Sequence, residues 1–308
     1  MSGTAFISHP DCSLHNMGKT HPESPDRLAA IQDRLIACGL EMYLEHFEAP
    51  AASIEQLQLA HSPPYIRHLF ESSPESGIVH LDPDTAMCSR TLAAAQRAAG
   101  AGILATDLVL RGEVDTAFCA VRPPGHHAER DRAMGFCFFN NVAIAARHAL
   151  QVHGLERVAI VDFDVHHGNG TEDIFADDPR VLMVGFFQHP LYPYSGATPR
   201  GPNMRNAPLP VHSKGDVVRE LVSNTWLPAL AEHRPQMLFV SAGFDAHYED
   251  DMASMGLFEH DYAWITEQLC DFARQHCAGR IVSMLEGGYD LSALGRSVAV
   301  HIKALAGI

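Results

Sequence analysis

Residues 158–171 read VAIVDFDVHHGNGT, a short and largely apolar run that ends in acidic and histidine side chains. The apolar residues of 158–163 are consecutive rather than alternating, which is typical of a strand buried on both faces of a parallel sheet. Asp162, Asp164 and His166 are spaced by two, so an extended backbone projects all three to the same side. The stretch therefore predicts a buried parallel strand with chemically active residues at its carboxyl end.

The rest of the chain repeats this alternation of a short apolar run with a longer helical pattern. Five further runs are interpreted as strands: residues 4–8, 116–121, 181–187, 237–241 and 281–285. Helices are expected over residues 91–110, 141–153, 217–232, 261–274 and 291–305. The clearest helix has Ser24 as its N-cap, Pro25 at its first position and Gly39 at its end. The alternation predicts an α/β fold: a single three-layer α/β/α domain over residues 1–308, with a mainly parallel central sheet.

One long segment, residues 188–210, has neither pattern. It reads QHPLYPYSGATPRGPNMRNAPLP and contains six prolines, which restrict the backbone. Long structureless loops inside compact domains are usually functional. Because this segment follows an expected strand, we interpret it as the rim of a pocket.

The composition excludes several classes of protein. Hydrophobic residues make up 46% of the 308 and charged residues 19%, which is too apolar for a disordered chain. The 22 basic and 37 acidic residues give a net charge of −15, which repels phosphate, so we expect no nucleic-acid partner. The same charge would attract cationic substrates, and it fits an ordinary solvated surface equally well.

Several features bear on where the protein works. No apolar run is long enough to span a membrane, and the amino terminus, MSGTAFISHPDC, lacks the basic and apolar parts of a secretory signal. Seven cysteines without a CxxC pair indicate reduced thiols. We expect a cytoplasmic protein without membrane association. The oligomeric state stays open, with a homodimer as one option.

Polar clusters follow four of the expected strands. They read RPPGHHAE (122–129), DFDVHHGNGT (162–171), GFDAH (243–247) and EGGYD (286–290). Because ligands collect beyond the carboxyl ends of the strands in parallel α/β sheets, we expect these clusters to form one site. A purely structural role for the protein would not explain why polar residues are concentrated at one edge of the sheet.

The first candidate within this site is a metal centre. The carboxylates of Asp162 and Asp164, crowded together with the imidazole of His166, would repel each other unless a cation or a hydrogen-bonded histidine lay between them. A further carboxylate from Asp245 would complete a site of three protein ligands with an open position for water, which is the catalytic kind. The competing interpretation is a pair of capping or core aspartates.

The second candidate is acid–base machinery. His126 and His127 follow the stiff sequence Pro-Pro-Gly, which would hold both rings at a defined point near the metal. Tyr289 follows Gly287 and Gly288, whose flexibility would let its phenol approach a bound carbonyl. Taken alone, a single histidine is more often structural, and Gly-Gly-Tyr is more often an exposed turn.

Together these motifs resemble the arginase-like histone deacetylase family, within its branch of class II-like bacterial histone deacetylases and acetylpolyamine amidohydrolases. The resemblance lies in RPPGHHA (122–128), GFCFFNN (135–141), VDFDVHHGNGT (161–171), SAGFDAH (241–247) and LEGGYD (285–290), with HPESPDRL (21–28) and HSPPYI (61–66) nearer the amino terminus. It implies an arginase-deacetylase-like fold and a zinc-dependent amidohydrolase that removes acetyl or short acyl groups from acetyl-lysine-type substrates and releases acetate.

The resemblance also implies roles for particular residues. The zinc ligands would be Asp164, His166 and Asp245. His127 would act as general base and then as general acid, with Asn169 behind it, while His126 would stay as an electrostatic partner with Asp162 behind it. Tyr289 would polarise the amide carbonyl. Because Asn169 is a neutral amide where class I members carry aspartate, we expect His127 to be less basic and free to accept a proton.

The same resemblance implies a substrate tunnel. Phe136 and Tyr192 would form its aromatic walls, and the Gly135 carbonyl would receive the substrate N–H. This chain departs from the family at Gly185, where a serine usually helps to bind a structural potassium ion, although K⁺ could still bind through the remaining contacts. It also has Met252 where acetylpolyamine-specific relatives carry a gatekeeping glutamate.

Several alternatives stay open. The substrate could be an acetylated lysine side chain or an acetylated polyamine, although an apolar Met252 favours lysine-type acetamides. Zn²⁺ could be replaced by Fe²⁺ or Co²⁺, because an Asp-His-Asp set is less selective than thiolates. A metal-containing protein that binds acyl-lysine without turnover would not need Tyr289 and both histidines. A binuclear manganese ureohydrolase would need further bridging carboxylates that we do not find.

Overall fold

The computed structural model describes residues 3–308, so Met1 and Ser2 of the amino terminus, where no secretory signal is expected, lie outside the described residues. An eight-stranded sheet runs through the centre in the order β2-β1-β5-β10-β9-β6-β7-β8, and every neighbouring pair is parallel. Its strands are β1 (Gly3–Ser8), β2 (Leu44–Glu48), β5 (Val114–Cys119), β6 (Val158–Asp162), β7 (Val181–Gln188), β8 (Met204–Leu209), β9 (Leu238–Ala242) and β10 (Ile281–Leu285). A separate hairpin pairs β3 (Ile78–His80) with β4 (Ala86–Cys88).

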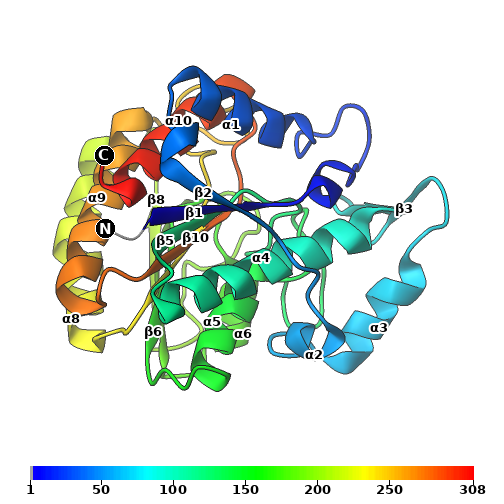
Figure 1. The fold of residues 1–308 in the computed structure, drawn as a ribbon, viewed down its shortest axis with the longest axis horizontal. Helices are drawn as coiled ribbons and strands as arrows, with labels where there is room; N and C mark the ends of the chain where they lie inside the picture. Colours follow the sequence, from blue (N-terminus) through cyan, green and yellow to red (C-terminus); the bar gives the residue numbers. More distant parts are fainter. Residues whose placement is uncertain (1–2) are drawn as a thin grey trace.

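Helices cover both faces of the sheet (Figure 1). One face packs against α4 (Thr91–Arg111) and α5 (Asn141–Gln151), and the other against α1 (Asp26–Ala37), α9 (Glu259–His276) and α10 (Leu291–Ala306). The remaining helices are α2 (Ile54–Leu57), α3 (Pro63–Ser72), α6 (Asn169–Phe175), α7 (Gly215–Leu221) and α8 (Leu227–His233). Short 3₁₀ turns cover Pro10–Ser13 and Glu41–Tyr43.

Strand β6 shows why this sequence needs two helical layers. All five of its residues are buried, with Val158 and Ile160 in the core under α4 and α5, and Ala159 and Val161 in the core under α9 and α10. A strand with apolar side chains on both faces is stable only when both faces are covered. Its register places Asp162 beside Ser241 of β9 and Gly185 of β7, so the residues that follow β6 and β9 emerge at the same edge.

The expected strands all form, with ends that differ by two residues or fewer, but β2 and β8 were missed. Both are edge strands, and their side chains are largely half-buried or exposed, so they lack the apolar signal of the inner strands. The prediction that residues 188–210 are structureless is therefore wrong over Met204–Leu209, which pairs with β7. Pro208 fits there because an edge strand tolerates a residue without an N–H group.

The helical predictions need two corrections. The chain is helical from 215 to 233, but a π-helical turn at Val222–Trp226 divides the helix expected over 217–232, and Pro228 lies in the first turn of α8. In α1 the N-cap is Pro25 rather than Ser24, and Asp26 is the first helical residue. Among residues 3–308, no helix combines the length and the apolar character that spanning a bilayer requires.

Candidate active site

Two carboxylates and one imidazole meet where β6 and β9 end. The Nδ1 atom of His166 lies 3.1 Å from Oδ1 of Asp164 and 3.0 Å from Oδ2 of Asp245. One potential ligand atom from each residue lies within 4.8 Å of the other two, and all three residues are buried. The structure thus brings together the three residues expected to bind a metal.

The surroundings of this group fit a divalent cation. The backbone N–H groups of Gly287 and Val165 donate to Asp164 and Asp245 at 2.8 and 3.0 Å, which fixes the orientation of both carboxylates. Burial and the neighbouring charge of Asp164 raise the pKa of Asp245 to about 6, because two buried carboxylates repel each other. A cation would relieve this repulsion, and one nitrogen with two oxygens is a donor set that suits Zn²⁺, Fe²⁺ or Co²⁺.

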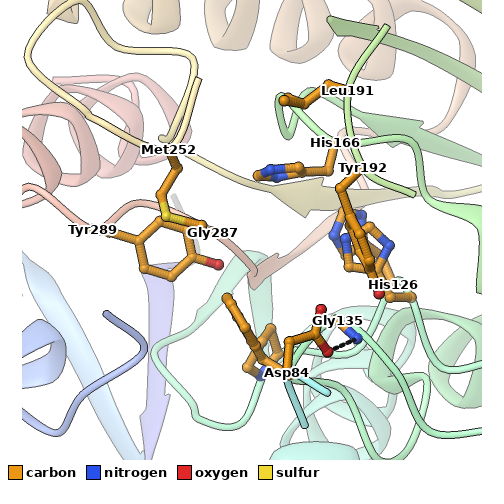
Figure 2. A pocket seen from close by; sticks show the side chains of 12 residues that line it. Asp84, His126, Gly135, His166, Leu191, Tyr192, Met252, Gly287 and Tyr289 are labelled. Atoms are coloured by element: carbon orange, nitrogen blue, oxygen red, sulfur yellow. Dashed lines mark hydrogen bonds between the residues drawn. The ribbon is translucent and has the colours of Figure 1, made fainter. Parts of the chain in front are cut away.

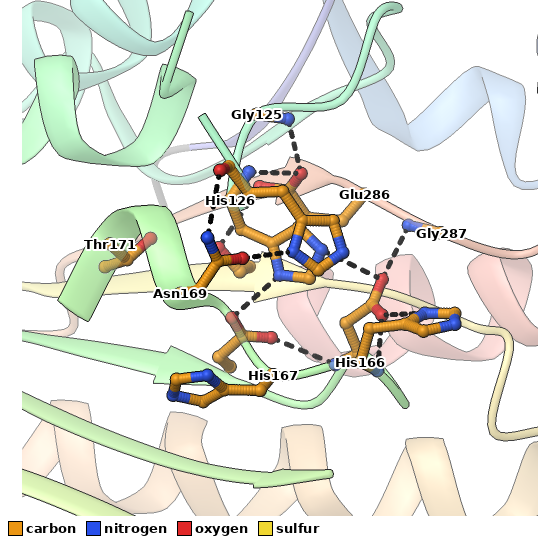
Figure 3. Close-up of polar contacts among 12 residues, drawn as sticks. Gly125, His126, His166, His167, Asn169, Thr171, Glu286 and Gly287 are labelled. Carbon is orange, nitrogen blue, oxygen red and sulfur yellow. Dashed lines mark hydrogen bonds and ion pairs between the residues drawn. The ribbon is translucent and has the colours of Figure 1, made fainter. Parts of the chain in front are cut away.

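Asp162, the first carboxylate of the β6 motif, lies outside this group and pairs with a histidine instead. Its Oδ2 lies 3.0 Å from Nδ1 of His126. Figure 3 shows the polar contacts around the His126 ring. Burial alone would lower the pKa of His126, but the charges of Asp164 and Asp162 outweigh it and raise the pKa to about 10. The His126 ring therefore favours the protonated form.

The adjacent His127 has the opposite character. Burial and the neighbouring charges of His126 and His166 hold its pKa well below the usual value for histidine. Its Nδ1 lies 2.8 Å from Oδ1 of Asn169, whose Nδ2 donates to Glu129 at 2.9 Å. Because an amide oxygen only accepts, Nδ1 of His127 carries the proton and Nε2 keeps a free lone pair.

A cavity of about 270 Å³ leads to this group (Figure 2). Gly135, Phe136, Tyr192 and Met252, the expected substrate-binding residues, all line it. Gly135 has φ = 57°, and a β carbon there would lie 2.3 Å from the His127 ring, so only glycine fits. The other lining residues are Asp84, Pro124, His126, His127, His166, Leu191, Gly287 and Tyr289, of which Asp84, Pro124 and Leu191 were missed.

Tyr289 reaches the cavity from the loop after β10, and Figure 2 shows its hydroxyl directed into the cavity. Enclosure raises the pKa of this phenol well above its usual value, so the hydroxyl stays a hydrogen-bond donor. The ring lies 5.9 Å from that of Phe136, measured between centroids, and the guanidinium carbon of Arg27 lies 4.9 Å from the same Tyr289 ring. Arg27 also donates to the Gly288 carbonyl at 2.7 Å.

Known proteins share this site's sequence motifs. A profile of the histone deacetylase domain matches residues 21–305. The chain belongs to the histone deacetylase domain family. It is 39% identical to the histone deacetylase-like amidohydrolase of Pseudomonas aeruginosa, over 87% of this chain and 72% of that protein. It is 36% identical to polyamine deacetylase HDAC10 of Homo sapiens, over 99% of this chain but only 48% of that protein.

A solved structure agrees with this assignment. The crystal structure of the HDA15 HD domain matches with a TM-score of 0.93 and 31% sequence identity, covering 100% of this chain and 90% of that chain. The predictions of the family, of the α/β fold class with a mainly parallel sheet, and of an enzyme that acts on amides are confirmed.

Two carboxylates that support the deacetylase site were missed. Asp250 accepts the backbone N–H groups of Tyr289 at 2.6 Å, Asp290 at 3.1 Å and Met252 at 3.0 Å, so one side chain ties both loops together. Glu286 accepts the N–H groups of Gly125 at 2.7 Å and His126 at 3.1 Å, and burial raises its pKa to about 7. Glu286 lies inside the LEGGYD motif, but nothing in that pattern shows that its carboxylate points to the His126 loop.

The loop that carries Tyr192 is held by a further histidine of the deacetylase motif. His167 lies 2.9 Å from Oγ of Ser195 through Nδ1 and 3.2 Å from Glu172 through Nε2. Gly196 packs so tightly on this ring that a β carbon would lie 2.5 Å from it. His167 therefore connects the Tyr192 loop to α6 rather than binding the metal.

Proposed function

We propose that this chain is a zinc-dependent deacetylase that removes acetyl or short acyl groups from acetyl-lysine-type amines and releases acetate. The observation that carries the proposal is that His127, whose Nδ1 contacts Asn169, lines one cavity with Tyr289 and with His166 of the Asp164–His166–Asp245 group. A base, a metal site and a hydrogen-bond donor around one small cavity are the parts that amide hydrolysis needs.

Each residue has a distinct part in the reaction. Asp164, His166 and Asp245 would hold Zn²⁺, which when bound supplies Lewis acidity toward the amide carbonyl and lowers the pKa of the attacking water. His127 removes a proton from that water through Nε2 as the water oxygen attacks the carbonyl carbon. Tyr289 donates its hydroxyl hydrogen bond to the oxygen on which negative charge develops.

The proton that His127 takes up leaves with the amine. As the bond between carbonyl carbon and nitrogen breaks, His127 returns its proton to that nitrogen, so acetic acid and a free amine form and the base is restored. The acid then ionises to acetate and its proton passes to the amine or to solvent. His126 would keep its proton through its contact with the Asp162 carboxylate, which accepts from Nδ1. Its positive charge lowers the basicity of His127 and favours this return.

The cavity walls fit a slender side chain. Phe136 and Tyr192 would flank the methylene stem of the substrate, and the ring of Tyr192 also lies 5.3 Å from that of His127. The Gly135 carbonyl would receive the substrate N–H. It already accepts a weak hydrogen bond from the Cys137 thiol at 3.2 Å, which leaves one lone pair for the substrate.

Two acidic residues near Met252, Glu249 and Asp250, have other partners and do not line the cavity, which supports an apolar entrance at Met252. Glu249 pairs with Arg296 at 2.6 Å, and Asp250 is occupied by three backbone N–H groups. Met252 itself lines the cavity and offers an apolar, adaptable surface. These positions support the proposal that the enzyme accepts acetyl-lysine-type substrates at least as well as acetylated polyamines.

A second candidate substrate class, the acetylated polyamines, is favoured by one observation. Among residues 3–308, Asp84 is the one carboxylate that lines the cavity. Its Oδ1 accepts the N–H of Gly135 at 3.1 Å and the hydroxyl of Thr85 at 2.8 Å, so the carboxylate is held in place. It could attract a second ammonium group on the substrate.

The two substrate classes are separated by comparing kcat/KM for an acetyl-lysine peptide and for N8-acetylspermidine. We expect the wild type to accept the peptide at least as well, and Met252→Glu to shift preference toward the polyamine. A tenfold wild-type preference for N8-acetylspermidine that disappears in Asp84→Asn would assign the enzyme to polyamines instead. A protein that binds acyl-lysine without turnover would release no acetate from either compound.

We further propose that a potassium ion can bind beside β6 despite the loss of the usual serine. Gly185 lies opposite Asp162 in the register of β6 and β7, and a β carbon there would lie 3.0 Å from the Asp162 carbonyl oxygen. Glycine leaves this carbonyl uncovered, which supports a site made mainly of backbone oxygens.

A further inference from the structure

A second group of metal-ligating side chains lies between α4 and the end of α5, which pack side by side (Figure 1). Oδ1 of Asp107 lies 2.7 Å from Nε2 of His148 and 2.7 Å from Nε2 of His153. The ligand atoms of the three residues lie within 4.8 Å of one another. Asp107 and His148 belong to the last turns of their helices, which precede β5 and β6, so the group lies at the sheet edge opposite the deacetylase site.

The group is partly enclosed and open to solvent on one side. The side chain of His148 is 7% exposed, while those of His153 and Asp107 are 26% and 29% exposed. Arg111 approaches the other carboxylate oxygen of Asp107 at 3.6 Å and also pairs with Glu113 at 3.3 Å. Within residues 3–308, the side-chain hydrogen-bond partners of Oδ1 are the two imidazoles, whereas the guanidinium of Arg111 approaches Oδ2.

We propose that Asp107, His148 and His153 form a second metal site, which binds a divalent transition-metal ion such as Zn²⁺. Two imidazole nitrogens and one carboxylate oxygen suit Zn²⁺, Co²⁺, Ni²⁺ or Cu²⁺ and do not suit Mg²⁺ or Ca²⁺, which prefer oxygen ligands. Water would fill the remaining position on the exposed side. The ion would join α4 to the turn that follows α5, where His153 lies.

The proton positions determine how tightly this site binds. In the hydrogen-bonded state both Nε2 atoms donate to Asp107, whereas metal binding requires each ring to carry its proton on Nδ1 instead. Nδ1 of His153 belongs to a ring with solvent access, but Nδ1 of His148 is buried and has no hydrogen-bond partner within residues 3–308. We therefore expect binding in the micromolar rather than the nanomolar range, weaker than at the deacetylase site.

The test is a titration of the metal-loaded enzyme with Zn²⁺ against a chromophoric chelator. The wild type is expected to hold two ions per chain, and His153→Ala only one. The matched control is His260→Ala, which removes another exposed imidazole that lies 3.4 Å from a carboxylate, that of Asp261. The His260→Ala variant is expected to keep both ions. His153 lies outside the deacetylase cavity, so His153→Ala is expected to keep full deacetylase activity.

The stoichiometries separate failure of this proposal from failure of the proposed function. One ion per chain that survives in His153→Ala would overturn the second site. If the wild type holds one ion and His153→Ala holds none, the result would support the second site and contradict metal binding at the deacetylase site. Arg111→Gln gives an independent readout, because removing a nearby positive charge is expected to tighten the second ion several-fold. Unchanged or weaker affinity in Arg111→Gln would contradict binding at Asp107.

Discussion

Nδ1 of His127 lies 2.8 Å from the side-chain oxygen of Asn169, and this contact determines which nitrogen of the ring can act as a base. The amide of Asn169 is oriented by Glu129, so its oxygen faces the ring and accepts the Nδ1 proton. One residue earlier, His126 makes the same kind of contact with the carboxylate of Asp162. Two adjacent histidines thus differ in basicity: burial and the charges of His126 and His166 lower the pKa of His127, whereas the charges of Asp164 and Asp162 outweigh burial and raise the pKa of His126.

Replacing the amide with a carboxylate should make His127 more basic. In Asn169→Asp, the acid limb of the kcat/KM profile is expected to move to higher pH by about one unit or more, because activity requires unprotonated His127. Below the raised pKa the base is already protonated, so activity is lost as the pH falls through it. The double variant with Glu129→Gln removes repulsion between the two carboxylates and should show the same shift. An acid limb at the wild-type position in both variants would rule out His127 as the base.

The Tyr289 hydroxyl should matter for chemistry and not for metal binding. Tyr289→Phe keeps the ring contacts with Phe136 and Arg27 but removes the hydrogen-bond donor. We expect kcat to fall by about two orders of magnitude, with near-normal metal content and hydroxamate binding. A variant with wild-type kcat would show that Tyr289 is only a turn residue.

Asp250 should act by positioning Tyr289. Asp250→Ala removes the acceptor for the backbone N–H groups of Tyr289, Asp290 and Met252, so the hydroxyl loses its fixed place. We expect kcat to fall by about ten- to a hundredfold with little loss of bound metal. The control is Asp251→Asn, which changes the exposed carboxylate next in sequence and should leave kcat unchanged. Equal effects in the two variants would contradict a positioning role.

Glu286 should make stability depend on pH. Burial raises its pKa from 4.5 to about 7 in the folded protein, so the folded state holds a proton that the unfolded chain releases. Its contribution to the free energy of unfolding therefore falls as the pH rises from about 4.5 to 7, and it is constant above that. The wild type should lose on the order of 3 kcal/mol of unfolding free energy over this pH range, and Glu286→Gln should not show this loss. Denaturant unfolding at pH 5 and pH 8 measures the difference, and parallel behaviour of both proteins would contradict it.

Much of the deacetylase site follows from local sequence spacing, because parallel strands bring their carboxyl ends to one edge. The spacing of two predicted that Asp162, Asp164 and His166 share one side of an extended strand, but β6 ends at Asp162 and residues 164–166 form a bend. This bend brings Asp164 and His166 together, and the register between β6 and β9 brings in Asp245. The spacing alone could not show that Asp162 turns to His126, because that depends on where a loop from another strand lies. The resemblance to the family supplied this pairing.

Residues that act across long sequence separations carried no local signal. Asp250 lies 39 positions from Tyr289, and Asp84 reaches the cavity from the turn between β3 and β4, which was not expected as a hairpin. The edge strands β2 and β8 were missed for a related reason, since half-exposed strands do not need the apolar pattern that marks buried ones. Hydrophobic patterns in the sequence therefore predict which strands are buried, but they do not predict which residues of different loops contact each other.

The most direct test of this account measures acetate release from an acetyl-lysine amide by chelator-treated protein, before and after Zn²⁺ is restored. We predict that chelation abolishes release in the wild type and that Zn²⁺ restores it, whereas Asp245→Ala stays inactive and lacks the ion at the cavity. Acetate release at the untreated rate by the metal-free wild type, or restored release by Asp245→Ala, would contradict the proposal that Asp164, His166 and Asp245 form the catalytic metal site.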